Sequence, residues 1–401
     1  MSGSTGAARQ DGAARNLLLG ALLASTVVVL PTIMLGALAV LVREELQFGE
    51  AALGLAAALF AASATAVSAP GGRLSERIGA ARTMTAGALI AGAALVAIAV
   101  LANSWATLVA CLMVAGIGNG LTQPATNGVL SGAISPQRQG LAFGFKQAAI
   151  PLAGMLSGLA LPLIGLRVGW RWAFAAGGVL ALGVALMVPR ARAALRLRQA
   201  QAPPPRVDGE DSAPLGPLLV ITFAGGMASA SANVIGAFFV ESTVASGVLE
   251  AQAGYWLTGA GACGIVARTL WGWLADRRTG RHLPFVSWLM AVGAVGLGVL
   301  ALRPAGGPGL VVGAVLAYGA AWGWPGLFNY AIVRQSRAAP AAATGVTQSG
   351  LFAGLLVGPP TFGWLVETTS YQVAWGVFAL LLLLAAALLR VGRVRLLRSR
   401  G

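Results

Sequence analysis

The sequence predicts an all-α membrane protein with twelve transmembrane helices, arranged in two pseudo-symmetric six-helix bundles. Composition is the first reason: 57% of the 401 residues are hydrophobic and 10% are charged, whereas soluble domains carry about 25% charged residues. The second reason is a series of apolar runs of about 20 residues, the length that crosses a bilayer as a helix. The third is a sequence motif that occurs once in each half of the chain.

The apolar runs define the predicted helices in order along the chain. In the first half the runs cover residues 17–42, 51–72, 83–102, 105–134, 140–166 and 170–189. In the second half they cover residues 215–241, 251–274, 283–302, 309–333, 343–366 and 372–389. The first run is too long for the apolar core of a signal peptide, so we expect it to remain as helix 1.

A polar segment separates the two series of runs. It begins with a basic stretch, continues with three consecutive prolines at residues 203–205, and ends with three acidic residues. This composition is typical of a linker. We therefore predict an N-terminal bundle over residues 1–189, a cytoplasmic linker over residues 190–217, and a C-terminal bundle with a basic tail over residues 218–401.

The repeated motif closes an apolar run in each half. It reads Gly-Arg-Leu-Ser-Glu-Arg at residues 72–77 and Gly-Trp-Leu-Ala-Asp-Arg at residues 272–277. A second echo, at nearly the same spacing, pairs Gly-Phe-Lys-Gln at residues 144–147 with Gly-Val-Thr-Gln at residues 345–348. A membrane protein with repeated halves is typically a transporter built from two related bundles.

This motif resembles the loop between helices 2 and 3 of the major facilitator superfamily and its echo between helices 8 and 9. The resemblance covers nearly the whole chain and implies the major facilitator fold. The first copy departs from the family in carrying Glu76 where aspartate is usual. The resemblance also implies that the two copies act in gating, as locks that hold one conformation; the residues concerned are Gly72, Glu76, Arg77, Gly272, Asp276 and Arg277.

The net charge of +15 is distributed unevenly along the chain. Arginines cluster in alternate loops, in the linker and in the C-terminal tail, and are sparse in the other set of loops. By the positive-inside rule this asymmetry predicts a multi-pass protein of the cytoplasmic (inner) membrane with both termini in the cytoplasm. Contact with anionic lipid headgroups accounts for the basic tail, and we expect no nucleic-acid partner.

Two cations lie within apolar runs. They are Lys146, the only lysine of the chain, and Arg268, whereas all twelve acidic residues fall outside the membrane centre. A charge inside a bilayer normally faces a watery cavity or a partner. An anionic substrate would supply the missing negative charge. Alternatively, both side chains extend along the helix to the membrane surface, which lies about 9 Å away for each.

A second resemblance bears on the substrate. Arg268 lies four residues before Gly272 and is similar to the helix 8 arginine that binds substrate carboxylate in the oxalate:formate antiporter and monocarboxylate porter groups. Oxalate exchangers of those groups also use a helix 11 lysine. This chain has Thr347 at the corresponding repeat position and carries Lys146 in helix 5 instead. This departure from the family argues against oxalate itself as the substrate.

Polar and aromatic side chains form further candidate sites. Asn119, Gln123 and Asn127 recur every four residues on helix 4, so they either line a cavity or hydrogen-bond a neighbouring helix. Tyr318 and Trp322 on helix 10 form either an aromatic cavity wall or ordinary packing. The predicted substrate-binding residues are therefore Arg268, Lys146, Gln147, Asn119, Gln123, Asn127, Tyr318, Trp322, Thr347 and Gln348.

Together these features predict a secondary active transporter that carries a small organic anion, a monocarboxylate by resemblance, through alternating access coupled to proton symport or anion exchange. The alternative is a proton-coupled exporter of drugs or other hydrophobic compounds, which would use an intramembrane carboxylate. A non-transporting sensor is a second alternative.

Because Cys111, Cys263 and His282 lie apart in the sequence, we expect no enzyme activity, no metal and no cofactor. The expected partners are the anion, protons and the lipid bilayer, and the protein is expected to act as a monomer.

Overall fold

The computed structural model describes residues 3–134, 138–188, 215–277, 282–302, 308–335 and 340–398, and within these ranges every regular element is helical. The predicted linker lies almost entirely outside the described residues. The first half comprises α1 (Gly3–Ala37), α2 (Ala39–Leu46), α3 (Glu50–Ile78), α4 (Ala80–Leu101), α5 (Trp105–Ala133), α6 (Gln139–Gln147), α7 (Ala149–Ala160), η2 (Leu161–Gly165), α8 (Leu166–Val168) and α9 (Trp170–Met187). The second half comprises α11 (Leu215–Val244), α12 (Glu250–Arg277), α13 (His282–Ala301), α14 (Pro308–Leu316), η4 (Ala317–Ala321), α15 (Pro325–Gln335), α16 (Pro340–Thr368) and α17 (Tyr371–Arg398).

These elements make twelve passes, which confirms the predicted fold class. Eleven spans in the described residues are long and apolar enough to cross a membrane. The twelfth is α12, whose 28 residues reach about 42 Å at 1.5 Å per residue, although it is more polar than the others and contains the buried Arg268. The fifth pass runs through α6, α7, η2 and α8, and the tenth runs through α14, η4 and α15.

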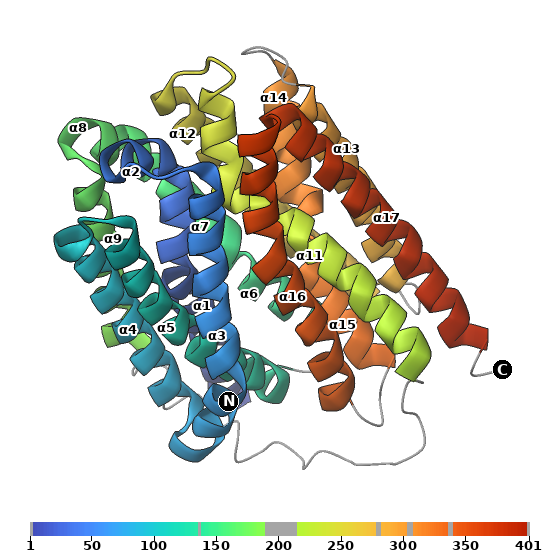
Figure 1. Ribbon diagram of the computed structural model, residues 1–401. Helices are drawn as coiled ribbons and strands as arrows, with labels where there is room; N and C mark the ends of the chain where they lie inside the picture. Colours follow the sequence, from blue (N-terminus) through green and yellow to red (C-terminus); the bar gives the residue numbers. More distant parts are fainter. Residues whose placement is uncertain are drawn as a thin grey trace.

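The helices form two bundles that stand side by side (Figure 1). In the first, α3 packs on α5, α4 packs on α5 and α9, and α1 packs on α7. In the second, α11 packs on α16 and α17, and α13 packs on α17. Between the bundles, α3 meets α16, α1 meets α11, and α6 and α7 meet α12. We call the side that carries both motif copies the motif face, at the bottom of Figure 1, and the other side the opposite face.

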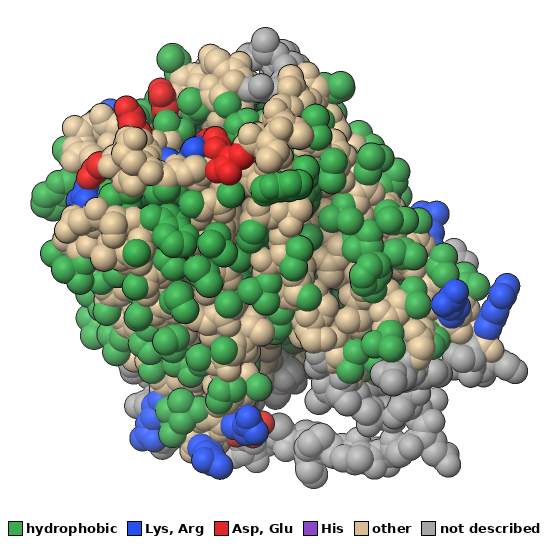
Figure 2. All heavy atoms as spheres, in the orientation of Figure 1, with side chains coloured by type: hydrophobic (Ala, Val, Ile, Leu, Met, Phe, Trp, Pro, Cys, Tyr) green, Lys and Arg blue, Asp and Glu red, His purple; other side chains and the backbone are tan. Residues whose placement is uncertain are grey.

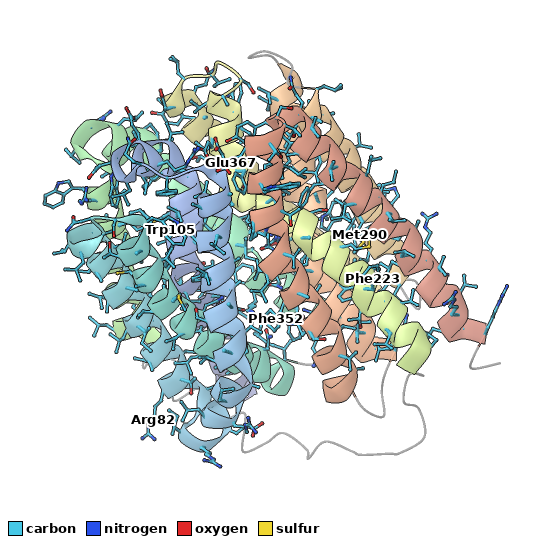
Figure 3. All side chains as sticks on the ribbon, viewed as in Figure 1. Arg82, Trp105, Phe223, Met290, Phe352 and Glu367 are labelled. Carbon is cyan, nitrogen blue, oxygen red and sulfur yellow. The ribbon has the colours of Figure 1, made fainter. Side chains whose placement is uncertain are left out.

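The surface agrees with a membrane location. On the side shown in Figure 2, charged side chains lie near the upper margin, at the lower left and along the right edge over the end of α17, and the broad face between them is made of hydrophobic and uncharged groups. Figure 3 places Arg82 at the lower end of the first bundle and Glu367 at the upper end of α16, with Phe223 and Met290 at intermediate heights in the second bundle. A transmembrane protein requires this separation because lipid tails do not solvate charge.

Two boundaries differ from the sequence prediction. The run at residues 17–42 does not form one helix, because the chain leaves the helical path at Leu38 and starts again as α2. The motif is not a loop in either half, since residues 72–77 form the end of α3 and residues 272–277 form the end of α12. In the first half the turn itself is made by Gly79, whose φ of 91° favours a residue without a Cβ.

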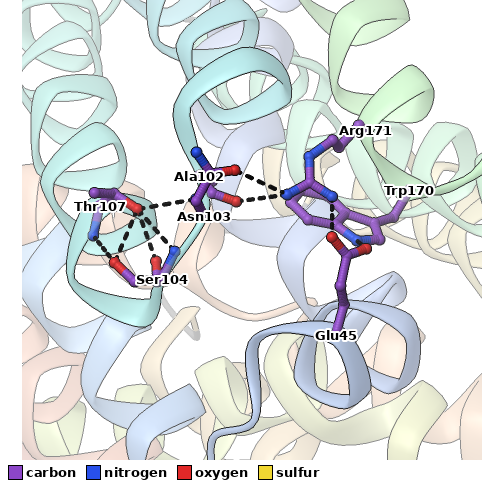
Figure 4. Close-up of polar contacts among 7 residues, drawn as sticks. All are labelled: Glu45, Ala102, Asn103, Ser104, Thr107, Trp170 and Arg171. Atoms are coloured by element: carbon purple, nitrogen blue, oxygen red, sulfur yellow. Dashed lines mark hydrogen bonds and ion pairs between the residues drawn. The ribbon is translucent and has the colours of Figure 1, made fainter.

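Polar contacts fix the opposite face of the first bundle (Figure 4). Arg171, at the start of α9, donates to the carbonyl of Ala102 at 2.8 Å and forms an ion pair with Glu45 of α2. Trp170 also donates to Glu45, at 2.6 Å. The hydrogen bond from Arg171 holds the pKa of Glu45 below its usual value of 4.5. These contacts join α2, the turn after α4 and the start of α9.

Candidate functional site

A cavity of about 210 Å³ lies between the two bundles. Its first wall comes from α1, α3, α5, α6 and α7, and its second wall comes from α11, α15, α16 and Trp322. Phe352, which lines it, lies between α3 and α16 in Figure 3. Lys146 is the only charged side chain among the described residues that line this cavity. The site is therefore a polar chamber with one positive charge and no carboxylate on its described walls.

Lys146 is held by the row of side-chain amides on α5. Its ammonium group donates to the side-chain oxygen of Gln123 and, at 3.1 Å, to the side-chain oxygen of Asn127. Gln123 in turn donates to the side-chain oxygen of Asn119 at 3.1 Å. Residues four apart lie on one face of a helix, so the three amides form a continuous row beside the lysine. The side chain of Lys146 is 2% exposed and ends on these amides.

Arg268 lies outside the cavity wall. Its guanidinium donates to the backbone carbonyls of Gln147 and Trp322. Both acceptor residues line the cavity, whereas Arg268 does not, so it lies one layer behind the wall in α12. In this conformation Lys146 lines the cavity and Arg268 does not, although both are predicted substrate-binding residues. The reason is that the Trp322 carbonyl, at a break in the tenth pass, offers the arginine a strong acceptor.

The tenth pass is interrupted at the height of the cavity. η4 is π-helical, residues 322–324 are not helical, and α15 begins at Pro325. Trp271 donates to the carbonyl of Gly319 at 2.8 Å, and Arg268 donates to the carbonyl of Trp322, so both hydrogen bonds run from α12 to the tenth pass. A π-helical segment inside a helix often marks a functional site. Two residues of α12 thus satisfy carbonyl groups that the irregular tenth pass presents.

Seven of the ten predicted substrate-binding residues line the cavity, and three do not. The seven are Asn119, Gln123, Asn127, Lys146, Gln147, Trp322 and Gln348. Besides Arg268, the residues outside its lining are Tyr318 and Thr347. Tyr318 is buried between Trp322 and Phe239, with ring centroids 5.3 and 6.0 Å away. Thr347 is buried and donates to the carbonyl of Ala343 at 3.2 Å.

The sequence analysis missed several polar residues of the wall. Thr32 and Ser68 line the cavity from the first half, and Asn233 and Asn329 line it from the second. The two asparagines carry the same signal as Asn119, a side-chain amide inside an apolar run. They occur singly, however, and a single amide gives no periodicity that would show which way it faces.

The two motif copies are engaged differently at the motif face. Asp276 accepts hydrogen bonds from the backbone amides of Gly140 and Leu141, at 2.9 and 2.8 Å, and so caps the start of α6. A Cβ on Gly272 would lie 2.5 Å from the carbonyl oxygen of Gly140. Arg277 stacks on Trp273 of its own helix, with the guanidinium carbon 3.7 Å from the ring centroid.

The first-half copy lacks such an interface within the described residues. Glu76 and Arg77 are exposed, and the described part of the chain gives Glu76 no hydrogen-bond or ion-pair partner. A Cβ on Gly72 would meet only Pro124, at 3.7 Å. The second-half copy therefore packs against the other bundle and hydrogen-bonds to it, whereas the first-half copy makes no such contact within the described residues.

The opposite face is closed by charged groups from both bundles. Arg43 of α2 forms ion pairs with Glu50 of α3, at 3.1 Å, and with Glu241 of α11. The side chain of Glu367, in α16, accepts a hydrogen bond from the backbone amide of Ala51 at 2.9 Å. α3 and α16 lie side by side at this end and diverge toward the motif face (Figure 1). These contacts join the two bundles at the opposite face.

The fold and this central cavity define a two-bundle membrane transporter, and comparison with known proteins gives its family. The model of the Major Facilitator Superfamily matches residues 17–220 and again residues 218–399. The chain therefore belongs to the major facilitator superfamily. Its structure is similar to that of the proton:xylose symporter XylE bound to 6-bromo-6-deoxy-D-glucose, with a TM-score of 0.70 and 17% identity over 94% of this chain and 95% of that one. No curated protein matches the sequence.

Proposed function

We propose that this protein moves a small organic anion, a monocarboxylate in its simplest form, across the cytoplasmic membrane by alternating access, with proton symport or anion exchange as the driving process. One observation carries the proposal: Lys146 is the only charged group on the described cavity walls, and its described partners are neutral amides. A buried charge without a counter-ion costs several kcal/mol in a membrane. A bound anion offsets that cost, whereas a bound cation would increase it.

Alternating access is supported by the unequal ends of the molecule. One ion pair and one hydrogen bond to the start of α3 join the bundles at the opposite face. At the motif face, the second-half copy is the one that contacts the other bundle among the described residues. The cavity lies between these ends, where a transporter of repeated halves holds its substrate. If the motif face is cytoplasmic, as the arginine distribution predicts, the structure represents a state closed to the outside.

The role of Arg268 changes with this geometry. In this conformation both terminal nitrogens of the guanidinium donate to backbone carbonyls, and the Nε–H is buried without a described acceptor, behind the cavity wall. We propose that Lys146 binds the anion directly. Arg268 positions Trp322 and Gln147, both of which line the cavity. A direct contact between Arg268 and the substrate would first require the tenth pass to move.

The test is ligand stabilisation of the purified full-length protein, with Lys146→Met compared with Gln252→Met. Gln252 is exposed near the start of α12, outside the cavity lining. The probes are hexanoate, benzoate, succinate and the lipophilic cation tetraphenylphosphonium. At least one anion should stabilise the native protein. Lys146→Met should weaken its binding about 10- to 100-fold, as expected for loss of a hydrogen bond to a charged group.

Two results would contradict the proposal. Equal anion affinity in native protein and Lys146→Met would remove the lysine from the site. Stabilisation by tetraphenylphosphonium but by no anion would favour the exporter of hydrophobic compounds instead. The Gln252→Met control should bind like the native protein, so that a general effect of substitution is separated from an effect at the site.

A further inference from the structure

The two walls of the central cavity present opposite hydrogen-bonding groups. On the first wall, Lys146 can only donate, so Gln123 and Asn127 must turn their side-chain oxygens toward it. The nitrogen of Gln123 then faces Asn119, whose side-chain oxygen accepts its hydrogen bond. The amide nitrogens of Asn119 and Asn127 are left without an acceptor among the described residues. The first wall therefore offers a cation and free N–H donors.

The second wall carries hydrogen-bond acceptors that lack a donor. Asn329 and Gln348 line the cavity from α15 and α16, and the side-chain oxygen of each is buried with no donor in the described structure. A buried acceptor left unpaired costs free energy, because it loses the hydrogen bond that water would have supplied. Neither oxygen is exposed to the cavity in this conformation. A turn of either amide about its last side-chain torsion, which has broad freedom, brings the oxygen to the cavity, where a ligand that donates to it recovers that free energy. A hydroxyl group is such a donor, and an alkyl chain is not.

We infer that the substrate is a hydroxylated carboxylate, such as a sugar acid, bound with its carboxylate at Lys146 and its hydroxyl groups toward Asn329 and Gln348. This inference rests on the proposed anion transport and narrows its substrate class. A plain aliphatic acid satisfies the first wall and leaves the second unpaired. A neutral sugar satisfies the second wall and leaves the lysine without a counter-ion. Only a molecule that is an acceptor at one end and a donor at the other fits both walls.

The size of the cavity agrees with a small ligand of this kind. Its volume of about 210 Å³ lies below the usual range of about 300–1,000 Å³ for drug-sized ligands. Trp322 adds an aromatic surface to the second wall, against which the C–H groups of such a ligand can pack. Discrimination of this type is strong, because a site built to hydrogen-bond a hydroxyl group rejects analogues that lack it.

The experiment compares three six-carbon probes on the purified full-length protein: gluconate, hexanoate and glucose. Gluconate should bind at least about tenfold more tightly than hexanoate or glucose. Asn329→Leu and Gln348→Met keep the side-chain size and remove the acceptor, so each should weaken gluconate about three- to tenfold and leave hexanoate unchanged. Gln252→Met makes the same chemical change outside the cavity and should alter neither.

The outcomes separate this inference from the proposal beneath it. Hexanoate binding as tightly as gluconate, with both lost in Lys146→Met, overturns the hydroxylated substrate and leaves anion transport intact. Glucose binding as tightly as gluconate, with neither affected by Lys146→Met, overturns both. Equal weakening of gluconate and hexanoate by Gln348→Met also contradicts the inference, because it shows a packing effect rather than recognition of hydroxyl groups.

Discussion

Lys146 and Arg268 carry the same charge and are both almost completely buried, yet their surroundings give them different roles. Lys146 ends on side-chain amides at the cavity wall. Arg268 ends on backbone carbonyls behind the wall. The planar guanidinium presents several donors in fixed directions and can bridge two carbonyls, which a single ammonium point charge does less well. The arginine is thus suited to hold two chain segments, and the lysine to meet a mobile ligand.

Arg268→Lys should separate positioning from binding. We expect the unfolding free energy to fall by about 1–3 kcal/mol, because at least one buried carbonyl loses its donor. Anion affinity should fall much less than in Lys146→Met. Thermal unfolding and ligand titration of the two variants check this expectation. An Arg268→Lys protein of native stability that has lost all anion binding would instead restore the arginine as a direct ligand.

Residue chemistry could be predicted from the sequence, but contacts between helices could not. The regular spacing of Asn119, Gln123 and Asn127 predicted that they line a cavity or hydrogen-bond a neighbouring helix, and in the structure they line the cavity while two of them accept from Lys146 of α6. Asn329 could not be assigned because one amide on a helix gives no direction. Arg268 could not be placed because its partner, the Trp322 carbonyl, depends on a break in a distant helix. Sequence identifies polar groups that need partners, and packing decides which partners they find.

At the scale of elements, the cap on α6 is the clearest connection between sequence motif and mechanism. The carboxylate of Asp276 meets two free N–H groups at the start of α6, where the helix dipole also favours negative charge. Donor and acceptor come from different bundles, so this cap stabilises only conformations in which α6 and α12 meet at the motif face. The resemblance predicts a lock at this motif, and the contact of Asp276 with α6 is where such a lock would act.

Asp276→Asn should weaken this cap, since an amide has one oxygen and no charge to offer the two N–H groups. We expect a loss of about 1 kcal/mol in stability and slower transport, with anion affinity largely retained. Glu76→Gln is the matched control, because Glu76 occupies the same motif position and is exposed. Its stability should stay within about 0.5 kcal/mol of the native protein. Equal effects of the two substitutions on unfolding would contradict the asymmetry between the copies.

For the whole molecule, the orientation in the membrane determines which way the cavity is closed. The arginine distribution predicts that the motif face and both termini are cytoplasmic. Single cysteines at Arg82, on the motif face, and at Glu44, near the opposite face, can test this in a background lacking Cys111 and Cys263. An impermeant thiol reagent applied outside the cell should label position 44 and not position 82. The reverse pattern would overturn the predicted orientation.

The glycine contacts between α6, α7 and α12 also affect how well the membrane stays sealed. A Cβ on Gly272 or Gly254 would lie 2.5 and 2.7 Å from the carbonyl oxygens of Gly140 and Gly158, so the helix backbones touch toward both ends of this interface. Contact this close leaves no room for a continuous file of water between the two helices. Ions therefore have no leak path along this interface. In this conformation the interface therefore helps to keep the solutions on the two sides of the membrane separate.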